Sequence, residues 1–232
     1  MESGASVVHF APGMLIAYGR AIDAVAHQHT LWQMCFPLQN SMLNGRAISD
    51  TFVIKPNEVH QLNMSCGWVV LAEPESQLGE AIAQAMPKLP HIDASTLATL
   101  KEQLTDFPEL VSAINNNPYN SDDQRIVKLL NRLDQCLSGD CLKPEQWRAQ
   151  DVANWLAISQ SRFLHLAKEQ LGMTWRSYLL WRRLICAIQS IKSGNSLTSA
   201  AYIAGFSDSA HLCRTIKKTF GMTSKQIIAS FG

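Results

Sequence analysis

The chain has 232 residues, 47% of them hydrophobic, which is enough for two modest cores and argues against a largely disordered protein. Its formal net charge of +1 hides a strong asymmetry: residues 1–146 carry a net charge of −7 and residues 147–232 a net charge of +8. The basic C-terminal part indicates an anionic partner such as nucleic acid. No stretch approaches about 18 uninterrupted apolar residues, and the N-terminus lacks a basic region ahead of an apolar run. We therefore expect a cytoplasmic protein without membrane association.

Residues 1–74 contain short runs of β-forming residues, such as VVHF, MLIAYG, TFVIK and WVVLAE, separated by Gly, Asn and Pro. This pattern predicts a small antiparallel barrel or sandwich. Alternate residues of a strand point the same way, so His27 and His29 should both face the interior, opposite His60. Three imidazoles are able to hold a metal, but Gln33 stands where an iron or manganese site would want a carboxylate. We predict a structural or pocket-lining role for these four residues, with metal binding as the alternative and no cofactor.

Residues 75–138 turn helical and polar, with segments such as QLGEAIAQAM and ASTLATLKEQL. One apolar stripe has helical spacing. It consists of Ile126, Leu129, Leu130, Leu133 and Leu137. Such a stripe is able to dock on the barrel, pair with a second subunit or pack within the chain. Residues 139–146 are predicted to be a linker. The six cysteines form no CxxC motif, which favours reduced thiols over disulfides.

Residues 147–232 contain the same small helical unit twice. KEQLGMT, which begins at Lys168, returns 49 residues later as KKTFGMT. In each copy a short helix, 150–156 or 197–204, precedes a tight turn and a second helix, with Ser159 and Ser207 as the predicted N-caps. Residues 174–193 lack Pro and Gly and predict a connecting helix about 28 Å long. The basic residues expected to face solvent from it are Arg176, Arg182, Arg183 and Lys192. One turn of B-DNA advances about 34 Å, so this helix is able to hold two helix-turn-helix units in successive major grooves.

From about Trp147 to Ser230 the sequence resembles the DNA-binding domain of AraC/XylS-type transcription regulators. The matching segments are SRFLHLAKEQLG, YLLWRRL and SLTSAAYIAGFSDSAHLCRTIKKTFGMT. Four departures stand out: Ala167 and Ile216 replace the usual Phe, Ser224 replaces Pro, and Ile227-Ile228 replace Tyr-Arg. The resemblance implies an α+β protein in which a cupin-like effector-binding barrel, residues 1–74, precedes a helical connector and a DNA-binding domain, residues 147–232. It also favours a homodimer through connector helices, and contact with RNA polymerase if the protein activates transcription.

We predict that the DNA-contacting residues lie on the second helix of each copy. They are Gln160, Ser161, Arg162, His165 and Lys168 in the first copy, and Ser209, His211, Arg214, Lys217 and Lys218 in the second. Leu164, Ala210 and Cys213 also match base-facing positions. Arg214 has the planar fork suited to guanine, whereas the lysines suit phosphates. We predict a sequence-specific, effector-responsive transcription regulator that is not an enzyme. The alternative is a metal-dependent cupin enzyme with an accessory helical domain.

Overall fold

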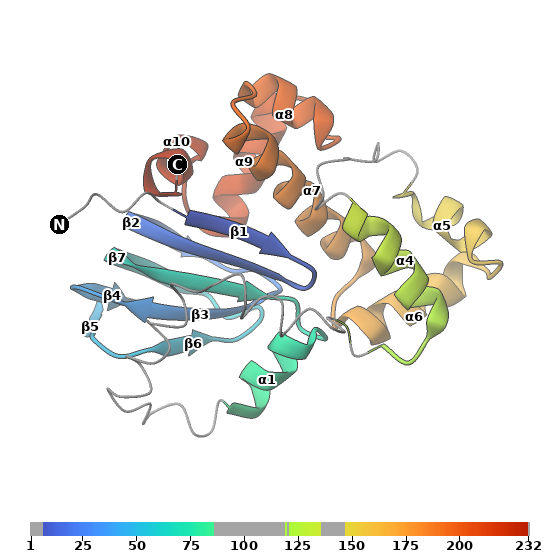
Figure 1. The fold of residues 1–232 in the computed structure, drawn as a ribbon, viewed down its shortest axis with the longest axis horizontal. Helices are drawn as coiled ribbons and strands as arrows, with labels where there is room; N and C mark the ends of the chain where they lie inside the picture. The colour runs from blue at the N-terminus through green and yellow to red at the C-terminus, as the bar shows by residue number, and fades with distance from the viewer. Residues whose placement is uncertain (1–6, 86–118, 120, 136–146, 232) are drawn as a thin grey trace.

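The computed structural model describes residues 7–85, 119, 121–135 and 147–231 (Figure 1). The strands are β1 (Val7–Ala11), β2 (Met14–His27), β3 (Trp32–Pro37), β4 (Ser41–Leu43), β5 (Arg46–Ile48), β6 (Phe52–Ile54) and β7 (His60–Ala72). The helices are α1 (Gln77–Ala85), α4 (Gln124–Asp134), α5 (Ala149–Trp155), α6 (Gln160–Leu171), α7 (Trp175–Lys192), α8 (Leu197–Ile203), α9 (Ser209–Phe220) and α10 (Ser224–Phe231). The predicted α+β class, with an N-terminal sheet and C-terminal helices, is confirmed.

The N-terminal strands form one antiparallel sheet in the order β1-β2-β7-β3-β6. Strand β4 pairs with the first half of β7 and with β5, while β3 pairs with the second half of β7. Among the described strands no pairing joins β1 to β6. One face of this sheet packs near α1, through a cluster that includes Ile16, Val70 and Leu78. The opposite face is left for the C-terminal helices.

About halfway along their length, the two long strands β2 and β7 switch which of their alternate residues face the C-terminal helices. Leu15 and Ala17 of β2 face a pocket there, but farther along the strand it is Ile22 and Ala24 that do so. Between them Ala21 has a φ of 50°, which an L-residue adopts only with strain. Both halves of the strand thus contribute apolar side chains to the same side.

The helices of the first helix-turn-helix unit begin and end close to where the sequence predicts. Ser159 caps α6 by accepting a hydrogen bond from the backbone N–H of Arg162 at 3.2 Å. The helix ends at Gly172, which adopts the left-handed conformation with a φ of 65°. Thr174 then caps α7, its hydroxyl accepting a hydrogen bond from the N–H of Ser177. The connecting helix therefore runs from Trp175 to Lys192, as the sequence predicts to within a residue.

The second unit differs from its prediction at the start of α9. The N-cap is Asp208 rather than Ser207, and its carboxylate accepts a hydrogen bond from the N–H of His211 at 2.7 Å. Ser207 instead donates its hydroxyl hydrogen to Asp208. A carboxylate satisfies the free amides of a helix N-terminus better than a hydroxyl does, because it is also attracted to the positive end of the helix dipole. A phosphate contact at this N-terminus is disfavoured, because Asp208 already places a negative charge there.

Arg182 was expected to face solvent from α7, but it is buried and joins three parts of the chain. Its guanidinium donates to Asp134 at 2.9 Å and to the Leu133 carbonyl of α4 at 2.9 Å. Glu73, at the end of β7, lies 4.0 Å away and accepts a hydrogen bond from the Trp181 indole. A buried charge is tolerated only when it is paired and hydrogen-bonded, which these partners provide. The prediction of an exposed Arg182 was wrong because its partners are distant in the sequence.

Burial raises the pKa of Glu73 from 4.5 to about 7, against the opposing effect of Arg182. The pKa of Glu73 is higher in the folded than in the unfolded chain. The stability that the protonated carboxyl gives to the folded state is therefore present below pH 4.5 and is lost as the pH rises through about 7. We expect Glu73→Gln to remove this loss. Chemical denaturation from pH 5 to 8 should show the wild type losing up to about 3 kcal/mol of unfolding free energy relative to the variant. Parallel pH profiles for the two proteins would contradict this assignment.

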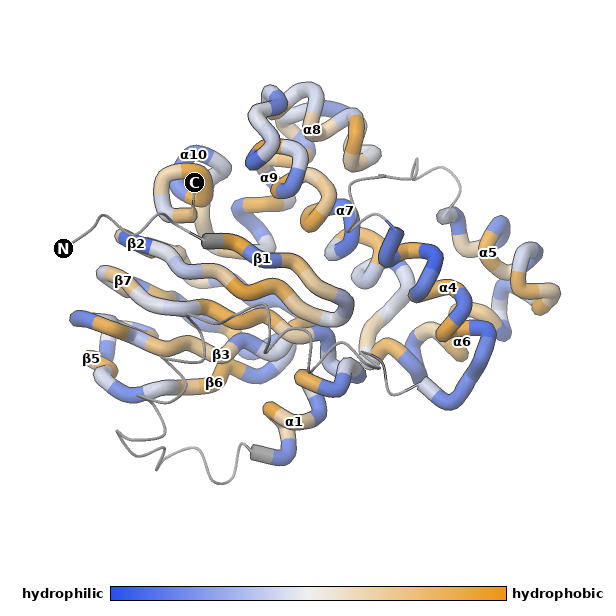
Figure 2. The backbone as a smooth tube through the Cα atoms, viewed as in Figure 1, coloured by the Kyte–Doolittle hydropathy of each residue, from blue (hydrophilic) through white to orange (hydrophobic). Residues whose placement is uncertain are grey.

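The apolar stripe of α4 is buried inside the chain. Ile126, Leu129, Leu130 and Leu133 are at most 2% exposed and pack with residues of α5, α6 and α7. Figure 2 shows the rest of α4 as largely hydrophilic, as expected for a helix with one narrow apolar face. Of the alternatives for this stripe, packing within the chain is the one observed. Leu137, the predicted segment ASTLATLKEQL and the linker 139–146 lie outside the described residues.

The cysteines follow the sequence expectation only in part. Cys35, Cys66 and Cys213 are free thiols, and burial raises the pKa of Cys35 to about 12, which leaves it inert. Cys186 of α7, in contrast, is disulfide-bonded. Helical placement and the absence of a CxxC motif were therefore not sufficient to predict its state.

Candidate DNA-binding surface and interdomain pocket

Helix α6 presents a largely polar accessible face. Gln160, Ser161, Arg162, His165 and Lys168 are all exposed, together with Leu164, which is 40% exposed. The opposite face is buried, through Phe163, Leu166 and Ala167. Ala167 is fully enclosed despite standing where a larger Phe is usual. All five residues predicted for the first copy thus share one accessible face of a capped helix.

Helix α9 presents a similar face with stronger charge. Arg214, Lys217 and Lys218 are exposed, whereas Ser209 and His211 are half-buried. His211 is held in place by a contact between its Nδ1 and the Ser207 hydroxyl at 3.1 Å, and by its ring stacking edge-on against Phe206. These two contacts make His211 better suited to shaping the start of α9 than to reading a base. Arg214, one turn farther on, is free to extend from the surface.

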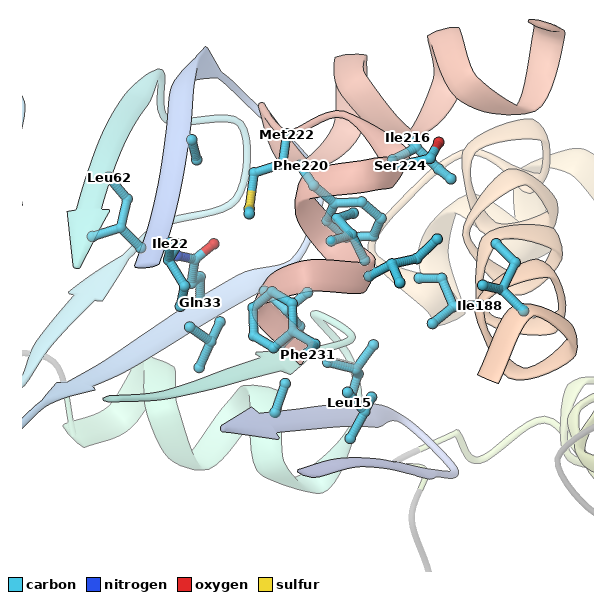
Figure 3. Close-up of a pocket in the computed structure, with 18 of the residues that line it drawn as sticks. Leu15, Ile22, Gln33, Leu62, Ile188, Ile216, Phe220, Met222, Ser224 and Phe231 are labelled. Carbon is cyan, nitrogen blue, oxygen red and sulfur yellow. The ribbon is translucent and has the colours of Figure 1, made fainter. Parts of the chain in front are cut away.

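An apolar pocket of about 230 Å³ lies between the sheet and the second helix-turn-helix unit (Figure 3). The sheet contributes Leu15, Ala17, Ile22, Ala24, Leu62, Val69 and Leu71, and the helices contribute Ile188, Ile191, Ile216, Phe220, Met222, Ile227, Ile228 and Phe231. The few polar groups include His27, Gln33 and Lys192. The sequence did not predict this pocket, because half of its wall comes from the domain expected to contact DNA. Ile227 and Ile228, which depart from the family's usual Tyr-Arg, form part of that wall.

The second unit is fastened to the sheet around this pocket. The N–H of Val25 in β2 donates to the carbonyl of Gly221, the residue that ends α9, at 3.0 Å. At the other end of α10, Ser230 donates to the carbonyl of Ala21 at 3.4 Å. Figure 1 shows α10 lying beside β2. Strand β2, which lines the pocket, is therefore bonded both to the end of α9 and to α10.

Gly19 of β2 provides the space in which Phe231 of α10 sits. A Cβ at Gly19 would lie 2.4 Å from the Phe231 ring and 2.8 Å from Ile22. We expect Gly19→Ala to lower the free energy of unfolding by about 1–3 kcal/mol, the usual effect of overpacking. In a Phe231→Ala background the same substitution should have a much smaller effect, which a double-mutant cycle measured by urea denaturation will reveal. An equal effect in both backgrounds would show that the ring does not occupy this space.

The three predicted histidines come together at the end of the sheet. His27, the last residue of β2, pairs in register with His60, the first residue of β7, and His29 follows in the next turn. His29 and His60 are buried, whereas His27 is half-buried and lines the pocket. Desolvation lowers the pKa of His27 and His29 to about 4, and that of His60 in the same direction. All three are therefore neutral near pH 7. Gln33 lies beside them, with its Oε1 2.8 Å from His29 Nε2.

No helix among the described residues has the length and apolar character needed to cross a bilayer.

The basic helical region matches a known domain family. Residues 152–229 match the model of a helix-turn-helix domain. The chain is 26% identical over 150 residues to the HTH-type transcriptional activator RhaS of Escherichia fergusonii, covering 64% of this chain and 53% of that protein. It is also 26% identical over 155 residues to RhaS of Pectobacterium carotovorum, covering 59% and 56%. The chain thus spans about half the length of the curated relatives it matches.

The fold is also similar to solved structures. ToxT from Vibrio cholerae superposes with a TM-score of 0.52 at 14% identity, covering 95% of this chain and all of that one. A second ToxT structure, from strain O395, gives a TM-score of 0.51 at 13% identity, with 93% and 96% covered. At such identity the likeness concerns the fold alone, but it extends over both the sheet and the helices. Together the domain match, the two relatives and the shared fold support an AraC/XylS-type regulator with its helix-turn-helix domain at the C-terminus.

Proposed function

We propose that this protein is a sequence-specific DNA-binding transcription regulator whose activity responds to a small apolar effector. The observation that carries the proposal is the pair of capped helices, α6 and α9, whose accessible faces bear Arg162, Lys168, Arg214, Lys217 and Lys218. The two helices flank α7, whose 18 residues span about 27 Å and suit adjacent major grooves. The net charge of +8 over residues 147–232 supplies the attraction to phosphates.

The experiment is a selection of bound fragments from a genomic library by the full chain. A matched variant carries Arg162→Glu and Arg214→Glu, two exposed positions whose replacement should leave the core intact. We expect the wild type to enrich a few fragments that share a motif, and the double variant to enrich none. Equal enrichment by both proteins would refute DNA reading by α6 and α9. Target genes would also indicate which molecules to test as effectors.

The pocket between the sheet and α9 supports the effector part of the proposal. Its walls are almost entirely apolar, so the favoured ligand has an apolar body, with any polar end directed at His27, Gln33 or Lys192. A ligand there touches both domains and therefore favours one placement of α9 over others. Candidate effectors should raise the thermal midpoint of the wild type, because a ligand that binds only the folded state stabilises it. They should also change its affinity for the selected DNA.

A homodimer, expected from the sequence, requires a surface other than the α4 stripe, because the described residues of that stripe lie within the core. Sedimentation of the free chain and of its DNA complex measures the assembly. Contact with RNA polymerase is proposed only for the case of an activator, and transcription assays on the selected DNA distinguish activation from repression.

A further inference from the structure

The histidine cluster has the geometry of a metal site. The ring centroids of His27 and His60 lie 4.1 Å apart, those of His29 and His60 5.2 Å, and those of His27 and His29 5.8 Å. One ring nitrogen from each histidine lies within 4.8 Å of those of the other two. Zinc bonds to imidazole nitrogens at about 2.0–2.1 Å in tetrahedral geometry, which places three such nitrogens roughly 3.3–3.4 Å from one another. A small reorientation of the rings is enough to reach these distances.

The backbone holds each ring by the same nitrogen. Nδ1 of His27 lies 2.8 Å from the Val25 carbonyl, Nδ1 of His60 lies 2.9 Å from the Glu58 carbonyl, and Nδ1 of His29 lies 3.2 Å from the Leu31 carbonyl. A ring that donates Nδ1–H to a backbone carbonyl presents the lone pair of its Nε2. Metal-bound histidines are oriented by such outer hydrogen bonds. The Nε2 atoms of His27 and His60 are therefore the ones available for a ligand, whereas that of His29 contacts Gln33 Oε1 at 2.8 Å.

His60 carries a buried polar atom that is suited to a ligand. The side chain is 1% exposed, yet its Nε2 has no hydrogen-bond partner among the described residues. Leaving a buried polar atom unpaired is unfavourable, and proteins retain such atoms mainly where a ligand or a function requires them. Because one ring nitrogen from each of the three histidines lies within 4.8 Å of the others, a species that accepts their lone pairs would satisfy this atom.

We propose that His27, His29 and His60 bind one divalent transition-metal ion of the zinc type through their Nε2 atoms. Neutral imidazoles suit zinc, copper, iron and nickel, whereas magnesium, calcium and manganese prefer the carboxylates that this cluster lacks. On binding, His29 gives up its contact with Gln33, and any proton on Nε2 moves to Nδ1, where the Leu31 carbonyl accepts it. Gln33 Oε1 then lies beside the fourth coordination position. This site departs from the metal-free cluster that the sequence favours.

The position of the site connects it to the DNA-binding domain. A Cβ at Gly221 would lie 2.5 Å from His27 Nδ1, so the end of α9 packs directly against the ring. His27 and Gln33 also line the apolar pocket, which gives a small molecule access to the metal's open position. The proposal does not depend on DNA binding, and its test uses metal binding alone.

The test is a titration of chelator-treated full-length protein with Zn²⁺ and Co²⁺, followed by calorimetry and visible absorption. We expect one ion per chain, and for Co²⁺ the absorption of a nitrogen-ligated site without an intense thiolate charge-transfer band. His27→Gln and His60→Gln should each weaken binding by at least about 10-fold, since even outer partners of a ligand contribute that much. His9→Gln, on β1 outside the cluster, is the matched control and should bind like the wild type.

Circular dichroism establishes that each variant is folded, and the half-buried His27 provides a readable variant if His60→Gln does not fold. Three results would overturn the proposal: no saturable binding by the wild type at micromolar metal, unchanged binding in His27→Gln, or a thiolate band that assigns the ion to cysteines.

Discussion

Replacing Arg182 with alanine is expected to lower the free energy of unfolding by about 3–5 kcal/mol, because the change leaves buried carboxylates without their cation. Arg182 is 6% exposed, and its partners Asp134 and Glu73 belong to α4 and to the end of β7. The Tyr119 hydroxyl also donates to the Asp134 carboxylate, lying 2.9 and 3.0 Å from its two oxygens, which further fixes the carboxylate in place. Since domains of this size are stable by roughly 5–15 kcal/mol, the variant should be only marginally folded at 37 °C.

The matched control is Arg176→Ala, an exposed arginine on the same helix, which should change stability by less than about 0.5 kcal/mol. Denaturant unfolding of both variants measures the difference. If Arg182→Ala were as stable as Arg176→Ala, the polar cluster would not be what joins the sheet, α4 and α7.

Replacing Arg214 with alanine is expected to lower affinity for the cognate site and to relax preference at one base pair. A bidentate arginine–guanine contact contributes about 1–3 kcal/mol of discrimination, a factor of roughly 5 to 150. Arg214 lies exposed near the middle of α9, where the corresponding position of α6 holds the shorter His165. Helix α9 should therefore contribute more to specificity than α6.

Lys217→Ala is the comparison for Arg214→Ala, because Lys217 is also exposed on α9 and is better placed for phosphate than for a base. This change should weaken binding to all sequences alike and make the slope of log affinity against log salt concentration shallower by about one. A panel of duplexes with single base changes separates the two variants. Equal loss on every duplex for Arg214→Ala would assign that residue to a phosphate.

Local signals were sufficient to predict the helix-turn-helix units. Ser159 and Thr174 cap α6 and α7 because a hydroxyl there satisfies a free amide, and Gly172 ends α6 because glycine accepts a positive φ without strain. The repeat of LGMT as FGMT indicates that the second helix of the second unit also ends at a glycine. At Asp208, however, two adjacent residues were both good caps, and the spacing did not decide between them.

The features that the sequence did not reveal depend on partners far apart in the chain. Nothing near Arg182 indicates that Glu73 and Asp134 will meet it, because 109 and 48 residues separate them. The pocket likewise forms only where α10 lies on β2. In the sequence alone, Ile227 and Ile228 are departures from the family pattern, and nothing there identifies them as residues of the pocket wall. The histidines were identified, but the unpartnered Nε2 of His60 emerged only from its burial.

The most direct test of the central claim is the salt dependence of binding by the full chain to a duplex carrying a selected genomic site. With roughly five to eight phosphates contacted by the basic faces of α6 and α9, the logarithm of the affinity should fall against the logarithm of salt concentration with a slope of about −4 to −7. The selected site should also bind at least about 1,000-fold more tightly than unrelated DNA at physiological salt. An affinity that does not change with salt, or no binding even at low salt, would contradict the assignment of this chain as a DNA-binding regulator.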